Sequence, residues 1–135
     1  MKNLHGCLLL ICTIAVLPVF AQSNTGNARS RKTAKIQYGT ASYYSNKFQG
    51  RPTAMGEPYD KNKMTCAHNS LPLGTWIKVT NLRNGKSVVV RITDRLHHKN
   101  KRLVDLSRIA ASKLGYLSRG LTRVKVEVLG KKKPV

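Results

Sequence analysis

Carboxylates are the scarcest functional groups in this chain, which has five aspartates and glutamates against 25 lysines and arginines and a net charge of +20. Two of the five, Glu57 and Asp60, fall within residues 53–68, a segment that ends in His68. Another, Asp94, follows in an apolar run further along the chain. Because so basic a chain keeps two carboxylates beside a histidine, we interpret residues 53–68, together with Asp94, as the candidate site for chemistry.

Long hydrophobic segments are also missing. The apolar run at residues 7–20 follows Lys2 and ends at Ala21, and it is too short and too close to a cleavage signal for a stable membrane span. We therefore predict a signal peptide at residues 1–21 and an exported protein of the periplasm or cell envelope, with no transmembrane span. Cys7 precedes the run and Cys12 lies inside it, so no lipid anchor is predicted.

Cysteine is equally sparse. Removal of residues 1–21 leaves Cys66 alone, which excludes an internal disulfide framework. The stability of residues 22–135, enough for one domain with a modest core, must therefore come from packing.

The chain also lacks the aromatic platforms and the basic helix that usually accompany nucleic-acid binding, so no nucleic-acid partner is predicted. Its charge still favours association with polyanions, and export directs that expectation to anionic polymers of the envelope. A contribution of the charge to solubility and non-specific adhesion is an equally good interpretation.

Composition divides the chain after the signal peptide into three parts. Residues 22–35 are polar and basic without an apolar period, which predicts a disordered linker. Residues 131–135 form a basic tail, and residues 36–130 are the expected folded unit.

Strand signals dominate the folded unit. Residues 37–45 suit a strand in which Gly39 allows a bulge or a close backbone approach, and residues 121–129 alternate as a last strand. Asn84-Gly85 separates two further alternating runs, which predicts a hairpin with a type I′ turn. The expected inward positions of these runs are Ile77, Val79, Val88, Val90, Ile92, Val124, Val126 and Val128.

One helix is expected at residues 107–114. Ser107 is a suitable N-cap, and Gly115 can adopt the left-handed conformation just beyond the helix. Several short strands and one helix are typical of a compact β-barrel, although composition alone does not separate a barrel from a sandwich.

The chain contains, in this order, GTASYYSNKFQGRPTAMGEPYD, MTCAHNSLPLGTWIKVTNLRNGKSVVVRITDR and RLVDLSRIAASKLG. These motifs resemble the rare lipoprotein A family over residues 38–129. The resemblance implies a mainly β fold, a six-stranded double-psi β-barrel with one or two short helices. It also implies a lytic transglycosylase that cleaves the β-1,4 bond between N-acetylmuramic acid and N-acetylglucosamine and leaves a 1,6-anhydro end.

The family's functional glutamate, histidine and aspartate fall on Glu57, His68 and Asp94. Two departures stand out. Cys66 replaces an alanine before the histidine, and residues 96–99 replace a Gly-Pro-Phe loop that we expect to border the cleft.

A lytic transglycosylase needs an acid that protonates the glycosidic oxygen and a base that accepts the proton of the muramyl C6 hydroxyl. We assign Asp94 as the acid/base, Glu57 as its partner and His68 as a positioning hydrogen-bonder. Dense positive charge lowers the pKa of a carboxyl group, so burial or a second carboxylate must oppose it. We therefore expect Glu57 and Asp94 to face one cleft within interaction distance.

Tyr44, Phe48, Thr53 and Arg95 are the expected substrate-binding residues. Simpler interpretations stay open for the three catalytic candidates. Glu57 could be a solvated loop acid, His68 a core histidine, and Asp94 the ion-pair partner of a neighbouring arginine.

The remaining acids receive structural interpretations: Asp60 as a turn residue, Asp105 as a residue that fixes the start of the helix, and Glu127 as an outward strand position. Cys66 and His68, even with His97 and His98, lack a second ligand pair at zinc spacing, so no metal and no other cofactor is predicted. Cys66 is instead expected to be a small buried apolar residue.

The leading prediction is an exported, endolytic, monomeric lytic transglycosylase that acts on peptidoglycan glycan strands. The first alternative is a non-catalytic, expansin-like module that binds anionic cell-wall polymer. A structural protein of the envelope is the second.

Overall fold

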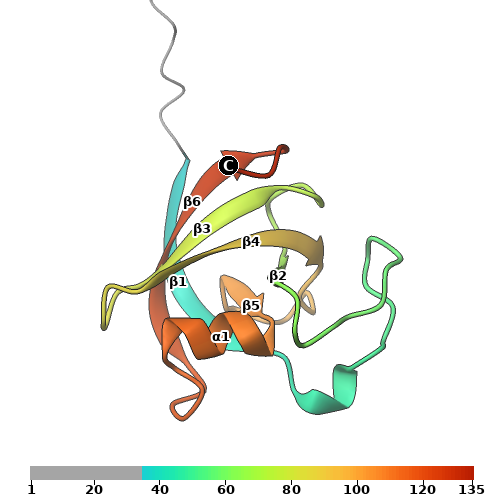
Figure 1. Ribbon diagram of the computed structural model, residues 1–135, viewed down its shortest axis with the longest axis horizontal. Helices are drawn as coiled ribbons and strands as arrows, with labels where there is room; N and C mark the ends of the chain where they lie inside the picture. The colour runs from blue at the N-terminus through green and yellow to red at the C-terminus, as the bar shows by residue number, and fades with distance from the viewer. Residues whose placement is uncertain (1–34) are drawn as a thin grey trace, which may run out of the picture. The chain divides into compact units, whose positions relative to one another are not determined.

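The computed structural model describes residues 35–135, so the predicted signal peptide at 1–21 and residues 22–34 of the predicted linker lie outside it. Six strands, one α-helix and one 3-10 helix make up this part of the chain (Figure 1). The strands are β1 (Ile36–Tyr43), β2 (Thr65–His68), β3 (Trp76–Asn81), β4 (Ser87–Asp94), β5 (Val104–Leu106) and β6 (Thr122–Gly130). The helices are η1 (Asn46–Phe48) and α1 (Arg108–Leu114). No helix in residues 35–135 has the length and apolar character needed to cross a membrane.

The strands close into a barrel in the order β1-β5-β2-β4-β3-β6, with β6 pairing back to β1. Two pairs, β1 with β5 and β2 with β4, are parallel, and the others are antiparallel. Parallel partners cannot be joined by a tight turn, so long connections must cross the barrel between them. The predicted mainly β, six-stranded double-psi barrel is therefore confirmed.

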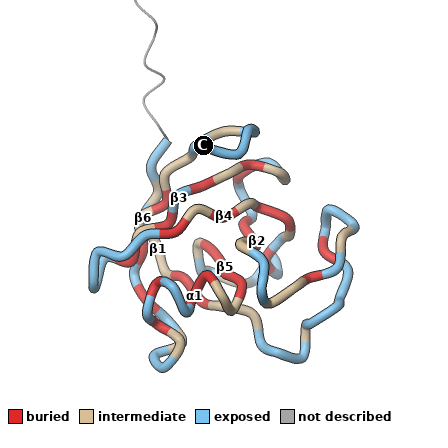
Figure 2. Tube along the Cα trace, viewed as in Figure 1, coloured by how far each residue is buried: buried red, intermediate tan, exposed pale blue. Residues whose placement is uncertain are grey.

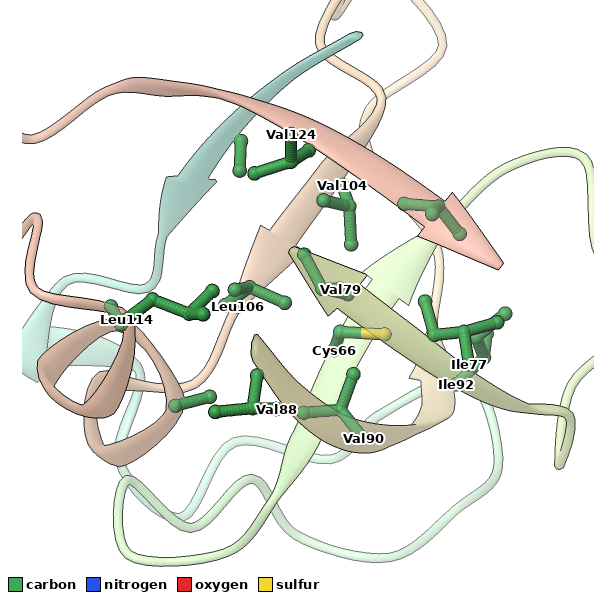
Figure 3. Packing of buried hydrophobic residues seen from close by; sticks show 14 of the residues in the cluster. Cys66, Ile77, Val79, Val88, Val90, Ile92, Val104, Leu106, Leu114 and Val124 are labelled. Carbon is green, nitrogen blue, oxygen red and sulfur yellow. The ribbon is translucent and has the colours of Figure 1, made fainter. Parts of the chain in front are cut away.

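The barrel interior is filled by the residues that alternation placed inward (Figures 2 and 3). Seven of the eight predicted positions are buried, and Val128 is partly buried against the same cluster. Cys66 lies in this cluster with no exposed surface, as expected for a small apolar residue. Since the described residues contain no disulfide, apolar packing is the main stabilising contribution to the fold.

The β3–β4 hairpin forms as predicted, but the type I′ turn is wrong. The Gly85 N–H donates to the carbonyl oxygen of Asn81, four residues earlier, so the turn is longer than a two-residue loop. Gly85 is left-handed, with φ of +76°. The buried Asn81 side chain explains the longer turn, because it accepts from the Arg83 N–H and donates to the carbonyl of Leu114 at the end of α1.

Helix α1 begins and ends where its caps predict. The Ser107 hydroxyl accepts from the Ala110 N–H, and Gly115 is left-handed with φ of +76°. Ala110, Ala111 and Leu114 bury one face against the barrel. The predicted close approach at Gly39 is also confirmed, because a Cβ at this position would lie 2.6 Å from the Cβ of Leu103.

A long connection, residues 44–64, joins β1 to β2 and carries most of the segment singled out in the sequence. In Figure 1 it extends to one side of the barrel, and Figure 2 shows it largely exposed. Tyr59, only 4% exposed, anchors it, and Pro52 and Pro58 form a β-bridge that closes a short loop. This loop brings residues 53–57 against the end of β4.

Candidate functional site

A hollow of about 510 Å³ lies where the 44–64 connection meets β2, β4 and β5. We call it the Asp94 hollow. Its walls combine aromatic rings, basic groups and two carboxylates: Tyr44, Phe48, Arg51, Pro52, Tyr59, Ala67, Asp94, Arg95, Leu96, His97, Asn100 and Asp105.

Strand register explains why both carboxylates reach this hollow. Ala67 on β2 pairs with Asp94 on β4 on one side and with Asp105 on β5 on the other. Directly paired residues point to the same side of a sheet, so both carboxylates share the outer side with Ala67. A bulge in the β2–β4 pairing, between Cys66 and Ala67, brings Asp94 rather than the preceding residue opposite Ala67.

Three donors hold the Asp94 carboxylate. Oδ2 accepts from the Tyr44 hydroxyl at 2.7 Å, and Oδ1 accepts from the backbone N–H groups of Ala54 at 3.0 Å and Arg95 at 2.9 Å. Neither Arg91 nor Arg95 forms an ion pair with it in the described part of the chain. The carboxylate is therefore fixed in position by hydrogen bonds and faces the hollow.

Tyr44 is itself locked by aromatic contacts. Its ring stacks on Tyr59 at 4.3 Å between centroids, and it meets Phe48 edge to face at 5.9 Å. Burial, and then the hydrogen bond to Asp94, raise the pKa of the Tyr44 hydroxyl, so it remains a donor at neutral pH. Of the four predicted substrate-binding residues, the aromatic pair, Tyr44 and Phe48, thus lines the hollow with Asp94.

Asp105 is the carboxylate with the altered acidity. Burial raises its pKa above the usual range, and the charge of Asp94 raises it further. The hydrogen bond from the Ser42 hydroxyl, at 3.0 Å, and the charge of Arg102 act in the opposite direction. Burial and a second carboxylate therefore do oppose the basic surroundings, but the pair is Asp94 and Asp105.

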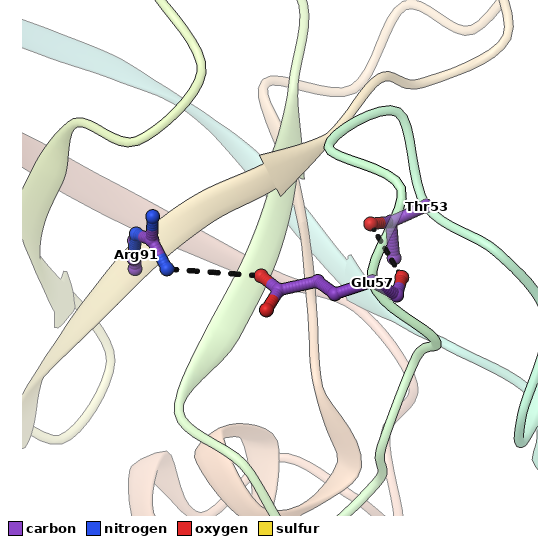
Figure 4. A network of polar contacts seen from close by, with 3 residues as sticks. All are labelled: Thr53, Glu57 and Arg91. Atoms are coloured by element: carbon purple, nitrogen blue, oxygen red, sulfur yellow. Dashed lines mark hydrogen bonds and ion pairs between the residues drawn. The ribbon is translucent and has the colours of Figure 1, made fainter.

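Glu57 lines a different hollow, so the expectation that it faces one cleft with Asp94 is wrong. Its carbonyl oxygen accepts from both the N–H and the hydroxyl of Thr53, and its carboxylate turns toward Arg91, 3.7 Å away (Figure 4). The neighbouring Ala54 N–H binds Asp94. The loop thus holds the Glu57 backbone near Asp94 but directs the Glu57 side chain away.

His68 also lies outside the Asp94 hollow. The His68 side chain is 1% exposed. Its Nδ1 accepts from the N–H groups of Ser70 and Leu71, so the ring proton is assigned to Nε2. Nε2 lies 2.9 Å from Gln37 Oε1. Burial, followed by the charge of Arg95, lowers the pKa of His68 to about 4. Its contacts are those of a buried histidine that fixes the turn after β2.

The other two predicted substrate-binding residues are engaged in holding loops. Arg95 lines the hollow, but its Nη1 donates to the carbonyl oxygens of His68 and Leu71. Thr53 is buried and binds the Glu57 carbonyl. Leu96 and His97 line the hollow, so the divergent loop at residues 96–99 does border it.

Asp105 lines the Asp94 hollow, although its position in the sequence predicted a structural role at the start of the helix. It makes no bond to the start of α1, which Ser107 caps. A usable signal was present, since Asp105 stands between Val104 and Leu106, both buried, and so must point away from the core. Asp60, by contrast, is a turn residue as predicted, because its Oδ1 accepts from the Asn62 N–H.

Metal ligation finds no support in residues 35–135, where no group of three acidic, histidine or cysteine side chains could hold an ion. His97 and His98 lie against each other at the surface, with ring centroids 4.3 Å apart. Burial raises the pKa of the Cys66 thiol, which keeps it protonated and unreactive.

Comparison with known proteins gives consistent matches. A family model described as "Lytic transglycolase" matches residues 36–126. A protein named endolytic peptidoglycan transglycosylase RlpA, from Pseudomonas aeruginosa strain UCBPP-PA14, is 56% identical over 89 residues, which cover 66% of this chain and 26% of the relative. The protein of that name from Neisseria meningitidis serogroup A is 46% identical over 101 residues, covering 73% of this chain and 42% of the relative.

A third protein of that name, from Haemophilus influenzae, is 41% identical over 133 residues and covers 96% of this chain but 46% of the relative. The chain therefore spans less than half the length of each of these three relatives.

Solved structures share the fold. The apo expansin of Clavibacter michiganensis superposes with a TM-score of 0.57 at 25% identity, covering 75% of this chain and 52% of the expansin. A Streptomyces papain inhibitor gives a TM-score of 0.57 at 23% identity and covers 70% of this chain and 94% of the inhibitor.

Proposed function

This chain belongs to the lytic transglycolase family of double-psi β-barrels, and we propose that it is an exported, endolytic lytic transglycosylase that acts on peptidoglycan glycan strands in the periplasm or cell envelope. The reaction breaks the β-1,4 bond between N-acetylmuramic acid and N-acetylglucosamine. It forms a 1,6-anhydro bond within the muramyl residue and consumes no water.

The observation that carries this proposal is the placement of Asp94 and Asp105 on either side of Ala67 in one hollow. A glycosidic bond is cleaved by one group that donates a proton and one that accepts a proton, and two carboxyl groups in different surroundings can divide these roles.

We assign Asp105 as the general acid. Its pKa is raised by burial, which favours the protonated form relative to a solvated aspartic acid. The Asp105 proton passes to the glycosidic oxygen as the C1–O bond breaks, and the N-acetylglucosamine residue leaves with a free 4-hydroxyl group. Asp105 becomes a carboxylate.

Asp94 is assigned as the base. Its carboxylate accepts the proton of the muramyl C6 hydroxyl while O6 forms the new bond to C1. The negative charge of Asp94 also stabilises the positive charge that develops at C1. Proton exchange with solvent then restores protonated Asp105 and ionised Asp94, so protons balance over one cycle.

The aromatic residues of the hollow supply binding and orientation. Phe48 and Tyr44 offer ring surface for the apolar faces of the sugars, and the Tyr44 hydroxyl keeps Asp94 in place. Three further residues support the hollow indirectly, because their polar atoms hold the loops that form it: Arg95, Thr53 and His68.

The basic surface supports a proposed association with anionic envelope polymers. Within residues 35–135, ion pairs join Arg91 to Glu57 and Lys125 to Glu127. Only two of the many basic side chains in this part of the chain are therefore paired with a carboxylate. The remaining charge would attract phosphate and carboxylate groups of the wall and concentrate the protein there. We propose that it acts as a monomer, since both carboxyl groups of the site come from one chain.

The proposal is tested by incubating the purified protein with wall glycan, both intact and stripped of stem peptides, and analysing the products by mass spectrometry. We expect new 1,6-anhydromuramyl ends within glycan strands. Absence of such ends from both substrates would contradict the enzyme. Sedimentation with the wall that weakens as salt rises, without product, would instead identify a non-catalytic binding module.

A further inference from the structure

The Asp94 hollow does not lie alone on its face of the barrel. Thr65 on β2 pairs with Arg91 on β4, and Arg91 pairs with Trp76 on β3. Thr65 lies two residues from Ala67 and therefore points to the same side of the sheet, so Arg91 and Trp76 share the outer side with the two carboxylates. The two carboxylates and the indole of Trp76 therefore lie on one face of the barrel, and residues 52–58 lie over the end of β4 between them.

A second hollow, of about 550 Å³, occupies the Trp76 end of this face. Trp76 is half-buried and lines it together with Met64 and Val89, which form an apolar wall. Lys63 and the tail residues 133–135 also line this hollow. Glu57 and Arg91 line it as well, paired at 3.7 Å with 42% and 36% of their side chains exposed. We call it the Trp76 hollow.

These groups form the combination that recognises a sugar. The indole provides a flat apolar surface for the C–H face of a pyranose ring, while a carboxylate accepts from hydroxyl groups and a guanidinium donates to hydroxyl or amide oxygens. A concave site that combines an apolar wall with hydrogen-bonding side chains is the usual form of a small-ligand site. The polar side chains that line this hollow are Glu57, Lys63, Thr65, Arg91 and Lys133. Because the Glu57–Arg91 pair is half exposed, its hydrogen-bonding groups are accessible from the hollow.

We propose that the Trp76 hollow is a second glycan subsite, which binds an N-acetylated amino sugar of the same strand that is cleaved at Asp94 and Asp105. The inference rests on the proposed function, since it extends the substrate across two hollows. It gives Glu57 a binding role, with its carboxylate held by Arg91 and directed at sugar hydroxyls.

The distance between the two hollows suits one continuous strand. Arg91 and Asp94 are three residues apart on β4, which corresponds to roughly 10 Å along the strand. This is comparable to the span of one disaccharide of a β-1,4-linked glycan. The loop closed by the Pro52–Pro58 bridge lies between them and contributes Pro52 to one hollow and Glu57 to the other.

The chain carries its own probe, because Trp76 is its single tryptophan. Tryptophan fluorescence therefore reports occupancy of the second hollow without any dependence on catalysis. We would titrate the full chain, as wild type and as Asp105→Asn, with peptide-stripped glycan strands and with the N-acetylglucosamine hexamer. Quenching by acrylamide would be measured at each step.

We expect both ligands to shift the emission to shorter wavelength and to shield Trp76 from acrylamide, since a stacked sugar excludes water and quencher. An emission spectrum and a quenching constant unchanged at saturating strand concentration would overturn the second subsite. Saturation is established independently by calorimetry.

Substitutions in the Trp76 hollow show which side chains contribute to the affinity for the glycan strand. Trp76→Ala and Glu57→Gln should each weaken strand binding in calorimetry by about three- to tenfold. Tyr38→Ala is the matched control, because Tyr38 is 61% exposed and lines neither hollow. Trp76→Phe keeps an aromatic surface and should recover most of the affinity, which excludes misfolding as the cause. Equal affinity in all four variants would contradict the subsite.

Failure of this inference and failure of the proposed function give different results. Anhydro products with an unshielded Trp76 would remove the second subsite and leave the enzyme. A shielded Trp76 without anhydro products would remove the enzyme and leave a glycan-binding face.

Discussion

Asp94 and Asp105 point into one hollow from strands that flank the same residue, Ala67. Their strands, β4 and β5, meet only through β2, so the backbones stand about 10 Å apart, two strand spacings. The charge of Asp94 raises the pKa of Asp105. Of the five acids in a chain of net charge +20, Asp94 is therefore placed where its charge acts on Asp105.

The pH dependence of cleavage should show the acidity of Asp105. A general acid works only while protonated, so the rate should fall as pH rises above the raised pKa of Asp105. The measurement is the initial rate of anhydro-end formation between about pH 4 and 8. A rate that increases steadily across this range would exclude Asp105 as the acid.

Removal of one hydroxyl group should disturb Asp94 without changing the shape of the hollow. Tyr44→Phe retains the ring that stacks on Tyr59 but loses the donor to Asp94 Oδ2. We expect kcat to fall about tenfold, equivalent to one hydrogen bond of roughly 1.4 kcal/mol, with KM nearly unchanged. A raised KM with unchanged kcat would show that the hydroxyl serves substrate binding instead.

Acid should destabilise the fold through His68. Its folded pKa of about 4 lies below the unfolded value of about 6.5, so between these values the unfolded chain binds a proton that the folded chain does not. The free energy of unfolding should therefore decrease as pH falls from about 6.5 to 4, by at most about 3 kcal/mol.

Urea unfolding at several pH values measures this slope. His68→Gln should flatten it, whereas His97→Gln, at an exposed histidine, should leave it unchanged. If His68→Gln retains the full slope, another group causes the acid sensitivity.

The hairpin turn should affect folding and leave catalysis intact. Gly85 has φ of +76° with no atom near its missing Cβ, so Gly85→Val introduces backbone strain but no clash. We expect a loss of about 1 to 2 kcal/mol in unfolding free energy, and a smaller loss for Gly85→Asn, which tolerates this conformation. Specific activity of the folded fraction should match wild type; a large loss would link the hairpin to the site.

Alternation and caps predicted the barrel well because each depends on local chemistry. Val79 and Val90 face the core because strand side chains alternate between the two sides of the sheet. Ser107 and Gly115 end the helix through contacts with residues close to them in the sequence. The longer turn at Gly85 was not predictable from Asn-Gly, because it depends on the bond between Asn81 and Leu114, 33 residues apart.

The site was harder to predict for the same reason. Asp94 and Tyr44 were named from the sequence, and both line one hollow. The residue that faces Asp94 across that hollow depends on which strands flank β2, and strand order is a property of the whole barrel. Glu57 was placed with Asp94 because the two are matched by family motifs, while the direction of its side chain is set by Thr53 and Arg91.

The most direct test of the central claim compares three variants and one control variant in the same assay of 1,6-anhydro ends on peptide-stripped glycan. Asp94→Asn and Asp105→Asn should each lower the rate by about a hundredfold or more, because each removes a proton-transferring group. Glu57→Gln should lower it far less, through weaker binding at subsaturating glycan, and Asp60→Asn serves as the control for a turn acid. A hundredfold loss in Glu57→Gln at saturating glycan, with Asp105→Asn near wild type, would contradict the assignment of Asp94 and Asp105 as the catalytic pair.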